Sequence, residues 1–277
     1  MRRTGDQERF LERTSDHPAT FSLLWTPGRE AVPTLVVTEG HGLGDVTGAS
    51  GVRCVMVSTS HARERAARLL ATYEGDPSAF RPPRETLGSF VIVDPSRRRC
   101  VLGRDRTAVQ HLYGTWDGDT VAVSTRLQPF MGTLSRGLDP TGCELFLAFG
   151  TLAPFPLYEG LSALATGHWI DLGPDSTQDT ASLSWGQIFW EIEPVEVPDQ
   201  YDVAVERYGE LLMRSIEETQ EGDAAGLLLS GGSDSACVLG ALSALGVRDI
   251  HAVHMHTDGQ KGGDYPLVRS LADAFDF

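Results

Sequence analysis

Short apolar runs separated by turn residues dominate the first half of the chain, with the spacing and composition of β-strands. Two turn signals, Asp94-Pro95-Ser96 and Asp117-Gly118-Asp119, each predict a hairpin. Apolar residues at helical spacing predict a helix over 61–73, whereas the glycine-rich stretch 40–51 predicts a surface loop. The predicted strands are 21–25, 34–38, 52–58, 88–93, 99–103 and 120–124.

A helix signal and then a linker signal mark the middle of the chain. Asp139-Pro140 supplies a cap followed by proline at the first helical position, and Gly150 supplies a stop, so residues 139–150 predict a helix. Strand-like sequence follows around 169–172. Residues 191–200 hold two prolines and three glutamates, and they predict a linker between two domains, 1–190 and 201–277.

The second predicted domain alternates helices and strands. A helix at 202–218 has an apolar face made of Val205, Tyr208, Leu212 and Ile216. It is followed by a strand at 226–229, a helix at 236–245, a strand at 250–257 and a helix at 264–275. This order predicts a parallel sheet covered by helices.

Composition and net charge argue against some classes of partner but say little about the activity. The 277 residues carry a formal net charge of −15, which argues against nucleic acid and anionic membranes as partners. Because the chain has no apolar run of about 18 residues and no apolar segment near its start, we expect a cytoplasmic protein without a membrane span or signal peptide. Four widely spaced cysteines predict reduced core thiols: Cys54, Cys100, Cys143 and Cys237.

A segment suited to phosphate binding lies where the strand at 226–229 meets the next helix. Ser230-Gly231-Gly232-Ser233-Asp234-Ser235 places two glycines and three hydroxyls at a helix N-terminus, where unpaired N–H groups and the helix dipole attract anions. The Asp234 carboxylate would repel a bare phosphate, so it predicts Mg²⁺ between the two. The chain contains no G-x-x-x-x-G-K-S/T sequence, which excludes a Walker loop.

This six-residue pattern resembles the pyrophosphate loop of the N-type ATP pyrophosphatases, which include asparagine synthetase, argininosuccinate synthetase and GMP synthetase. The resemblance implies that the loop surrounds the β- and γ-phosphates of ATP and that Asp234 holds Mg²⁺. It also implies that the backbone of Leu228 and Val253 meets the adenine and that Met255 adds an apolar wall; burial of these residues in the strand core is compatible with that role. The implied ATP-binding residues are Leu228, Ser230, Gly231, Gly232, Ser233, Asp234, Ser235, Val253 and Met255.

Five short segments of the first domain follow a recognisable order: Gly88-Ser89-Phe90, Leu102 to Arg106, Leu112-Tyr113, Val123 to Leu127 and Leu164 to His168. Their order resembles the glutaminase-like domain of asparagine synthetase. The resemblance implies an Ntn-hydrolase-like αββα sandwich, followed by the start of a pyrophosphate-loop parallel α/β domain. It also implies that Arg104, Asp105 and Arg106 form a structural network.

Two departures from that family concern its ammonia supply. Residue 2 is Arg2, where asparagine synthetase has the cysteine that hydrolyses glutamine, and residues 57–62 replace its glutamine-binding N-G-E-I-Y-N segment with Val-Ser-Thr-Ser-His-Ala. Nucleophilic catalysis needs the nucleophile and its base together, so we expect no glutaminase activity. In this respect the chain is similar to β-lactam synthetase and to the lasso peptide macrolactam cyclase.

These resemblances imply an ATP-dependent ligase that activates a carboxylate as an acyl-adenylate, releases pyrophosphate and closes a lactam with an amine of the same substrate, as in lasso peptide formation. The alternatives are an asparagine synthase-like amidotransferase, a β-lactam synthetase and a truncated, non-catalytic binding paralogue. The expected partners are a peptide or small amino-acid substrate, and a leader-binding protein or complementing chain. Because 201–277 predicts only two strands, we expect it to be the N-terminal part of a synthetase domain, in a longer protein or a split enzyme.

Overall fold

The computed structural model divides the chain into two compact units, Met1–Ile192 and Glu193–Phe277. The division falls inside the predicted linker 191–200, of which only residue 200 is described. The residues that the structure describes are 4–14, 20–26, 33–40, 42–107, 110–117, 120–134, 137–150, 157–174, 176, 186–190, 200–255 and 264–275.

Unit 1 contains two antiparallel sheets. The strands of the first are β1 (Thr20–Trp25), β2 (Thr34–Thr38), β7 (Tyr113–Asp117), β8 (Thr120–Ser124) and β9 (Ser162–Ala163), in the order β2-β1-β8-β7-β9. The strands of the second are β3 (Leu43–Thr47), β4 (Arg53–Val57), β5 (Ser89–Asp94), β6 (Arg99–Arg104), β10 (His168–Leu172) and β11 (Gln187–Ile188), in the order β11-β10-β6-β5-β4-β3. The two predicted hairpins are present as β5–β6 and β7–β8, although residues 118 and 119 lie outside the described residues.

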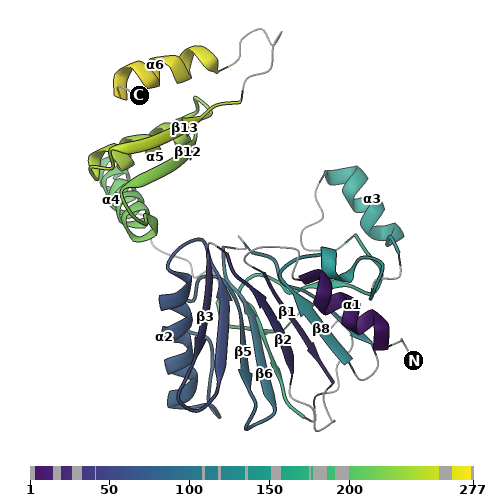
Figure 1. Cartoon of the computed structure of the whole chain (residues 1–277). Helices are drawn as coiled ribbons and strands as arrows, with labels where there is room; N and C mark the ends of the chain where they lie inside the picture. The colour runs from purple at the N-terminus through teal and green to yellow at the C-terminus, as the bar shows by residue number, and fades with distance from the viewer. Residues whose placement is uncertain are drawn as a thin grey trace. The chain divides into compact units, whose positions relative to one another are not determined.

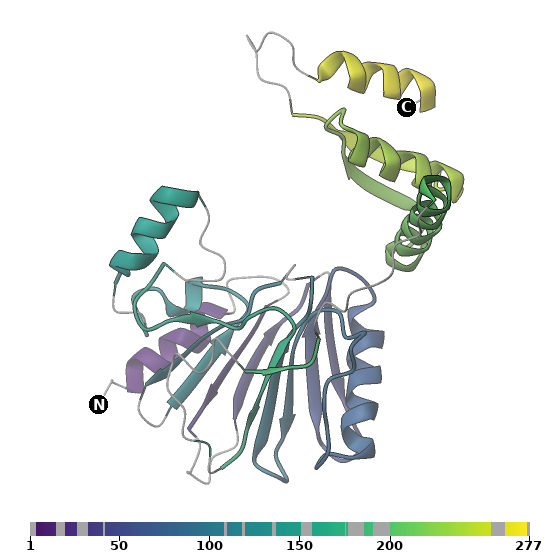
Figure 2. The same ribbon diagram turned by 180° about the vertical axis from the view of Figure 1, so that it is seen from behind.

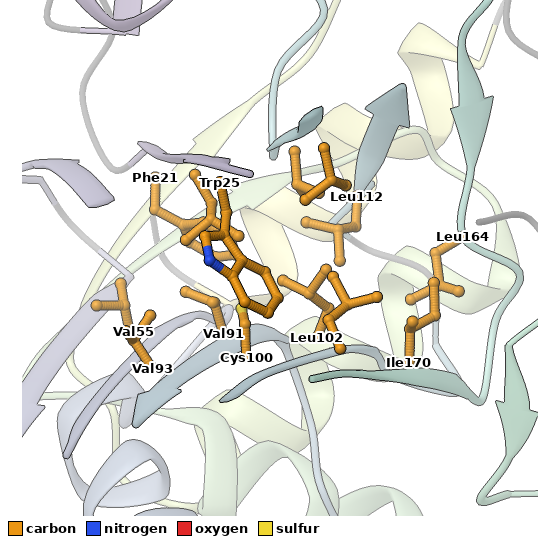
Figure 3. Close-up of a cluster of buried hydrophobic side chains, with 14 of the residues drawn as sticks. Phe21, Trp25, Val55, Val91, Val93, Cys100, Leu102, Leu112, Leu164 and Ile170 are labelled. Atoms are coloured by element: carbon orange, nitrogen blue, oxygen red, sulfur yellow. The ribbon is translucent and has the colours of Figure 1, made fainter. Parts of the chain in front are cut away.

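The main core of unit 1 lies between the facing sheets. Phe21 and Trp25 of β1 pack in one cluster with Val91 of β5 and Leu102 of β6, as Figure 3 shows. Alternate residues of the second sheet, such as Met56 and Phe90, point to the other face. Strand β5 is therefore buried at every position, because both faces of its sheet are covered.

Helices cover the outer faces of both sheets. Helix α2 (Ala62–Gly75) buries Ala66, Leu69, Leu70 and Tyr73 against the second sheet. Helix α1 (Thr4–Thr14), with the short 3₁₀ helix η1 (Gln128–Phe130), covers the first sheet. The two views show α1 and α2 on opposite sides of the sheets (Figure 1) (Figure 2). The layers are therefore α–β–β–α, the order expected from the sequence; α1 itself was not expected.

Part of the surface loop predicted near the start of unit 1 is a strand. Residues 40–51 were predicted to be a surface loop, but Leu43–Thr47 form β3, which pairs with β4 along five residues. Gly44 explains the discrepancy, because a Cβ at this position would lie 2.2 Å from the Ala62 carbonyl oxygen at the start of α2. A glycine that suggested a loop is instead required for the close approach of strand and helix.

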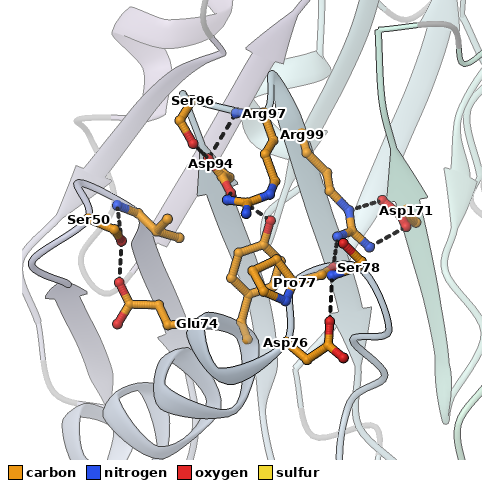
Figure 4. Close-up of polar contacts among 12 residues, drawn as sticks. Ser50, Glu74, Asp76, Pro77, Ser78, Asp94, Ser96, Arg97, Arg99 and Asp171 are labelled. Carbon is orange, nitrogen blue, oxygen red and sulfur yellow. Dashed lines mark hydrogen bonds and ion pairs between the residues drawn. The ribbon is translucent and has the colours of Figure 1, made fainter.

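A buried polar network ties α2 to the β5–β6 hairpin and to β10 (Figure 4). Asp94, with no exposed surface, accepts hydrogen bonds from Tyr73 Oη at 2.9 Å, Ser96 Oγ at 2.6 Å, and Arg97 N and Nη1 at 3.0 and 3.1 Å. Beside it, Arg99 forms a bidentate pair with Asp171 on β10, at 2.7 and 2.6 Å. Four donors on one buried carboxylate make Asp94 the centre of this network.

Helix α3 (Pro140–Phe149) begins and ends as predicted. Asp139 Oδ1 accepts a hydrogen bond from Gly142 N at 2.7 Å, and Gly150 ends the helix in the left-handed conformation, with φ 68°. The helix is largely exposed, and Leu147 keeps 84% of its surface accessible.

Unit 2 begins with helix α4 (Tyr201–Thr219) and continues with β12 (Ala224–Leu228), α5 (Ser233–Ala244), β13 (Asp249–Val253) and α6 (Tyr265–Phe275). The two strands are parallel and in register from Ala224↔Asp249 to Leu228↔Val253. One face of the pair packs against α5 and α6 in a small cluster around Leu229, Leu239 and Val268. The predicted apolar face of α4 is only partly covered: Leu212 and Ile216 are half-buried, whereas Val205 and Tyr208 are exposed.

None of the helices in the described ranges combines the length and apolar character that crossing a membrane requires.

Candidate functional site

The phosphate-binding candidate is the turn between β12 and α5. After β12 the ladder continues by one bond, from Leu229 N to the Val253 carbonyl at 2.9 Å. The chain then turns through Gly231, with φ 82°, and Gly232, which precedes α5 in an extended conformation. The turn therefore lies at the carboxyl end of both parallel strands, the edge at which open α/β sheets bind their ligands.

Two serines brace this turn. Ser235 Oγ accepts a hydrogen bond from Ser230 N at 3.2 Å and lies 3.1 Å from Ser230 Oγ. Ser230 Oγ accepts a hydrogen bond from Gly232 N at 3.3 Å, and Ser235 Oγ donates to the Gly232 carbonyl at 3.2 Å. Ser230 and Ser235 thus shape the loop from within.

The two glycines are needed for different reasons. A Cβ on Gly231 would lie 2.9 Å from Asp264 Cβ and 3.0 Å from the Asp264 carbonyl, so packing and the positive φ both require glycine there. A Cβ on Gly232 would meet only Ser230 Oγ, at 3.3 Å. Space beside Gly232 is consistent with an anion approaching the N–H groups in the first turn of α5.

Asp234 stands at the start of α5 with an exposed carboxylate, and its Oδ1 accepts a hydrogen bond from Ser233 Oγ at 3.2 Å. Among the described residues, no group of three or more His, Cys, Asp or Glu could by itself hold a metal ion. One carboxylate nevertheless suits Mg²⁺ that is also bound by phosphates, because this ion is commonly held by one or two carboxylates together with phosphate oxygens and water.

The residues predicted near the adenine are exposed among the described residues, and the expected burial in the strand core is not seen for them. Leu228, Val253 and Met255 keep 80%, 59% and 90% of their surface accessible. Leu228 and Val253 are register partners and therefore lie side by side. The structure thus brings every predicted site residue to one edge of the strand pair.

A cleft of about 530 Å³ lies at the opposite end of unit 2, lined by Asp223, Gly246 and Asp249 among others. These residues precede or begin the strands, whereas the loop follows their carboxyl ends. The loop site is therefore separate from this cleft.

Sequence reasoning missed three residues that contact the loop region. His254 Nδ1 lies 2.9 Å from the Leu229 carbonyl, the His254 ring lies 6.0 Å from the Tyr265 ring, and Asp264 faces Gly231. The sequence predicted a strand at 250–257, which contains His254, and a helix from 264, but gave no sign of these contacts. His256 and Lys261 lie outside the described residues.

In unit 1, the stretch that replaces the glutamine-binding segment is packed into the fold. Ser58 and Ser60 are buried, and both hydroxyls accept hydrogen bonds from the Arg65 guanidinium at 3.3 Å. His61 adopts a left-handed conformation, with φ 49°, immediately before α2. The side chains of Ser58 and Ser60 therefore hydrogen-bond to the beginning of α2 through Arg65.

Arg104 and Asp105 are buried, as expected of a structural network, whereas Arg106, the third residue predicted for it, is exposed. Arg104 donates to the carbonyls of Leu164 at 2.7 Å and Gln110 at 3.1 Å, and it lies 2.9 Å from His111 Nδ1. Asp105 accepts from Gly88 N at 2.5 Å. Burial lowers the pKa of Arg104, and burial together with the Arg104 charge lowers the pKa of His111.

The cysteines divide into two classes. Cys54 and Cys100 lie inside β4 and β6, and burial raises the pKa of both thiols. Cys143 is half-buried and Cys237 is exposed, so the prediction of four core thiols is wrong for these two. The two helices that carry them, α3 and α5, have few buried residues. The buried thiols are protonated and inaccessible, and unsuited to attack glutamine.

Comparison with known proteins reveals a distant relative. Over 200 residues the chain is 24% identical to the putative asparagine synthetase (glutamine-hydrolysing) 2 of Methanocaldococcus jannaschii, and the match covers 68% of the chain and 36% of that protein. The chain thus spans little more than a third of its relative, and the similarity supports an asparagine synthetase-like relationship at this coarse level. No family model matches the chain.

Two solved structures show weaker likeness. Glutamine phosphoribosylpyrophosphate amidotransferase from B. subtilis, complexed with ADP and GMP, matches 90% of the chain and 62% of its own, with 11% identity and a TM-score of 0.31. A structure described as the allosteric regulatory enzyme of purine biosynthesis matches 93% and 65%, with 10% identity and a TM-score of 0.30. Likeness at this level carries no conclusion about function.

Proposed function

We propose that this chain carries the first part of an ATP-dependent, AMP-forming amide ligase of the asparagine synthetase type. The supporting observation is the turn between β12 and α5, where residues 230–235 present a helix N-terminus, hydroxyls and the Asp234 carboxylate at the carboxyl edge of parallel strands. The distant similarity to an asparagine synthetase agrees with this assignment.

In this proposal the N–H groups of the first turn of α5 and the Ser233 hydroxyl bind the β- and γ-phosphates of ATP. Asp234 provides the carboxylate for a magnesium ion shared with those phosphates. Exposed Leu228, Val253 and Met255 provide apolar contact for the adenine. A substrate carboxylate then attacks the α-phosphorus, giving an acyl-adenylate and pyrophosphate, and an amine displaces AMP to form the amide.

The amine in this proposal belongs to the substrate itself, so the product is a lactam. Two features of the N-terminal unit support this choice. The Ser58 and Ser60 hydroxyls are hydrogen-bonded to Arg65, and the thiols of Cys54 and Cys100 are buried. A unit that does not release ammonia from glutamine leaves an internal amine as the acceptor, and proximity favours ring closure. A peptide substrate, as in macrolactam formation, is preferred to a small amino acid.

The remaining parts of the reaction need residues beyond those described here. Because the match covers 36% of the relative's length, we propose that a further segment or a complementing chain supplies the acceptor side of the site. A leader-binding protein is a further candidate partner for a peptide substrate.

Binding of ATP with Mg²⁺, measured by isothermal titration calorimetry, tests the first step. Asp234→Ala should weaken binding in the presence of Mg²⁺ by about tenfold, which corresponds to about 1.4 kcal/mol. Asp249→Ala is the matched control, because Asp249 is an exposed carboxylate at the opposite end of β13. Equal affinity of both variants and the wild-type chain would exclude Asp234 as the metal ligand.

A further inference from the structure

Leu229 directly follows β12, and its carbonyl is the last backbone group before the loop; the residue is buried, 2% exposed. Its N–H is still part of the ladder, bonded to the Val253 carbonyl. The carbonyl itself accepts a hydrogen bond from the His254 side chain, with Nδ1 2.9 Å from the oxygen. Because a carbonyl can only accept, the bond requires the proton on Nδ1.

The His254 side chain replaces the backbone donor that would continue the strand ladder at the Leu229 carbonyl. A buried carbonyl needs a partner, and the chain beyond Leu229 turns away into the loop. His254 therefore fixes the direction in which the chain leaves the strand. The next residue is Ser230, whose hydroxyl accepts from Gly232 N and contacts Ser235 Oγ. Because Ser230 directly follows Leu229, the orientation of the Leu229 carbonyl also affects the position of the Ser230 hydroxyl, which shapes the loop.

The start of α6 supports the loop from a second side. The ring of Tyr265 lies 6.0 Å from the His254 ring at an angle of 31°, and the adjacent Asp264 lies against Gly231. Two consecutive residues, Asp264 just before α6 and Tyr265 at its start, therefore meet the glycine and the histidine that set the path of the loop. His254 links the ends of both strands to this helix.

We infer that His254 is a positioning residue for the nucleotide loop. It holds the Leu229 carbonyl with Nδ1 and rests near Tyr265, so that residues 230–235 keep the conformation that receives the ATP phosphates. This inference depends on the proposed function for its ligand, but its structural content, the ordering of the loop, is measurable without any nucleotide.

Three variants separate this role from a general effect on folding. His254→Asn keeps an N–H donor on the γ-carbon, where it can replace Nδ1, whereas His254→Leu removes the donor and keeps an apolar side chain of moderate size. His251→Leu is the matched control, because His251 lies on the same strand with an exposed side chain paired to Asp249. The affinity for ATP with Mg²⁺, the hydrogen exchange of the 230–235 amides and the melting temperature are measured for each.

His254→Leu should weaken ATP binding by about tenfold and speed amide exchange in residues 230–235, while His254→Asn should stay within about threefold of the wild-type affinity. His251→Leu should change neither. If His254→Leu binds ATP and exchanges like the wild-type chain, the positioning role is refuted. If His254→Asn is as impaired as His254→Leu, the donor is not what matters and the role is again refuted, even where both variants melt early.

Failure of the proposed function gives a different pattern. If the wild-type chain does not bind ATP, the nucleotide assignment fails. The amide exchange of the nucleotide-free variants then still decides whether His254 orders the loop: faster exchange only in His254→Leu supports ordering, and unchanged exchange overturns it.

Discussion

Substitution of Asp94 by Asn tests the polar network that links α2 to the β5–β6 hairpin. The two side chains have nearly the same shape, so the change creates no cavity. It replaces one carboxylate oxygen by an NH₂ group, and each oxygen of Asp94 accepts two hydrogen bonds. Whichever way the amide turns, one Arg97 N–H (N or Nη1) meets a donor instead of an acceptor, and one hydroxyl (Tyr73 or Ser96) must reverse its role and accept from the NH₂ group.

The expected cost follows from burial and from the number of lost bonds. Hydrogen bonds to a charged group contribute about 1.5–3 kcal/mol each, so losing one should destabilise the unit by about 1.5–3 kcal/mol. The ion pair with Arg97 adds little, because the arginine side chain is 50% exposed. The expected fall in melting temperature is roughly 3–12 °C.

The pH dependence gives an independent check. Burial alone would raise the pKa of Asp94, but the hydrogen bonds from Ser96, Arg97 and Tyr73 outweigh it and hold the pKa below its ordinary value. A carboxyl whose pKa is lower in the folded state stabilises fully above its unfolded pKa of about 3.9 and loses that contribution as pH falls through the folded pKa. The stability gap between wild type and Asp94→Asn should therefore narrow below about pH 4.

Thermal unfolding followed by circular dichroism at pH 7 and at pH 3 measures both effects. Asp45→Asn is the control, since Asp45 pairs with Arg53 where both side chains are about one-third exposed, and its loss should cost about 1 kcal/mol or less. An Asp94→Asn shift no larger than that of Asp45→Asn, or a gap that does not narrow at pH 3, would refute the reasoning.

Three further predictions concern other parts of the chain. In the native protein a thiol reagent should modify Cys237 rapidly and leave Cys54 and Cys100 unmodified until unfolding, and equal rates would contradict their burial. Gly44→Ala should lower the unfolding free energy by about 1–3 kcal/mol, because the new Cβ forces β3 away from α2, and an unchanged melting temperature would show that the contact yields easily. Incubation with glutamine should release no glutamate above background, because Arg2 stands where asparagine synthetase has its nucleophilic cysteine, and sustained turnover would overturn that conclusion.

The strands of unit 1 were predictable because their signals are local. The apolar runs at 34–38 and 120–124 match β2 and β8 residue for residue, and Asp139 and Gly150 mark the ends of α3 as their capping chemistry requires. The conformation of these segments can be predicted from their own residues, without contacts to distant parts of the chain.

The elements that were missed depend on distant contacts. Helix α1 has a strongly charged sequence and is held by Phe10, which packs at 4.9 Å between ring centroids on Phe130, far along the chain. Strand β3 depends on the glycine that fits beneath α2. Neither interaction can be derived from spacing within the segment itself.

The candidate site likewise combines features that were predictable from local sequence with contacts that were not. The pattern from Ser230 to Ser235 was sufficient to place the loop before a helix, and β12 and β13 pair in parallel as the βαβα order predicted. The contact of His254 with Leu229 was not predictable, because it needs the strand register that places Val253 beside Leu228. Roles of the loop residues toward ATP and Mg²⁺ stay predictions.

The central claim is that residues 230–235 receive the phosphates of ATP, and amide chemical shifts during a titration with ATP and Mg²⁺ test it most directly. In ¹⁵N-labelled protein, the amides of Gly231, Gly232 and Ser233 should shift most, in a saturable manner. The amides of Gly222 and Gly246, which line the cleft at the other end of the strands, should not move. Shifts confined to that cleft, or no saturable shift in residues 230–235, would contradict the account.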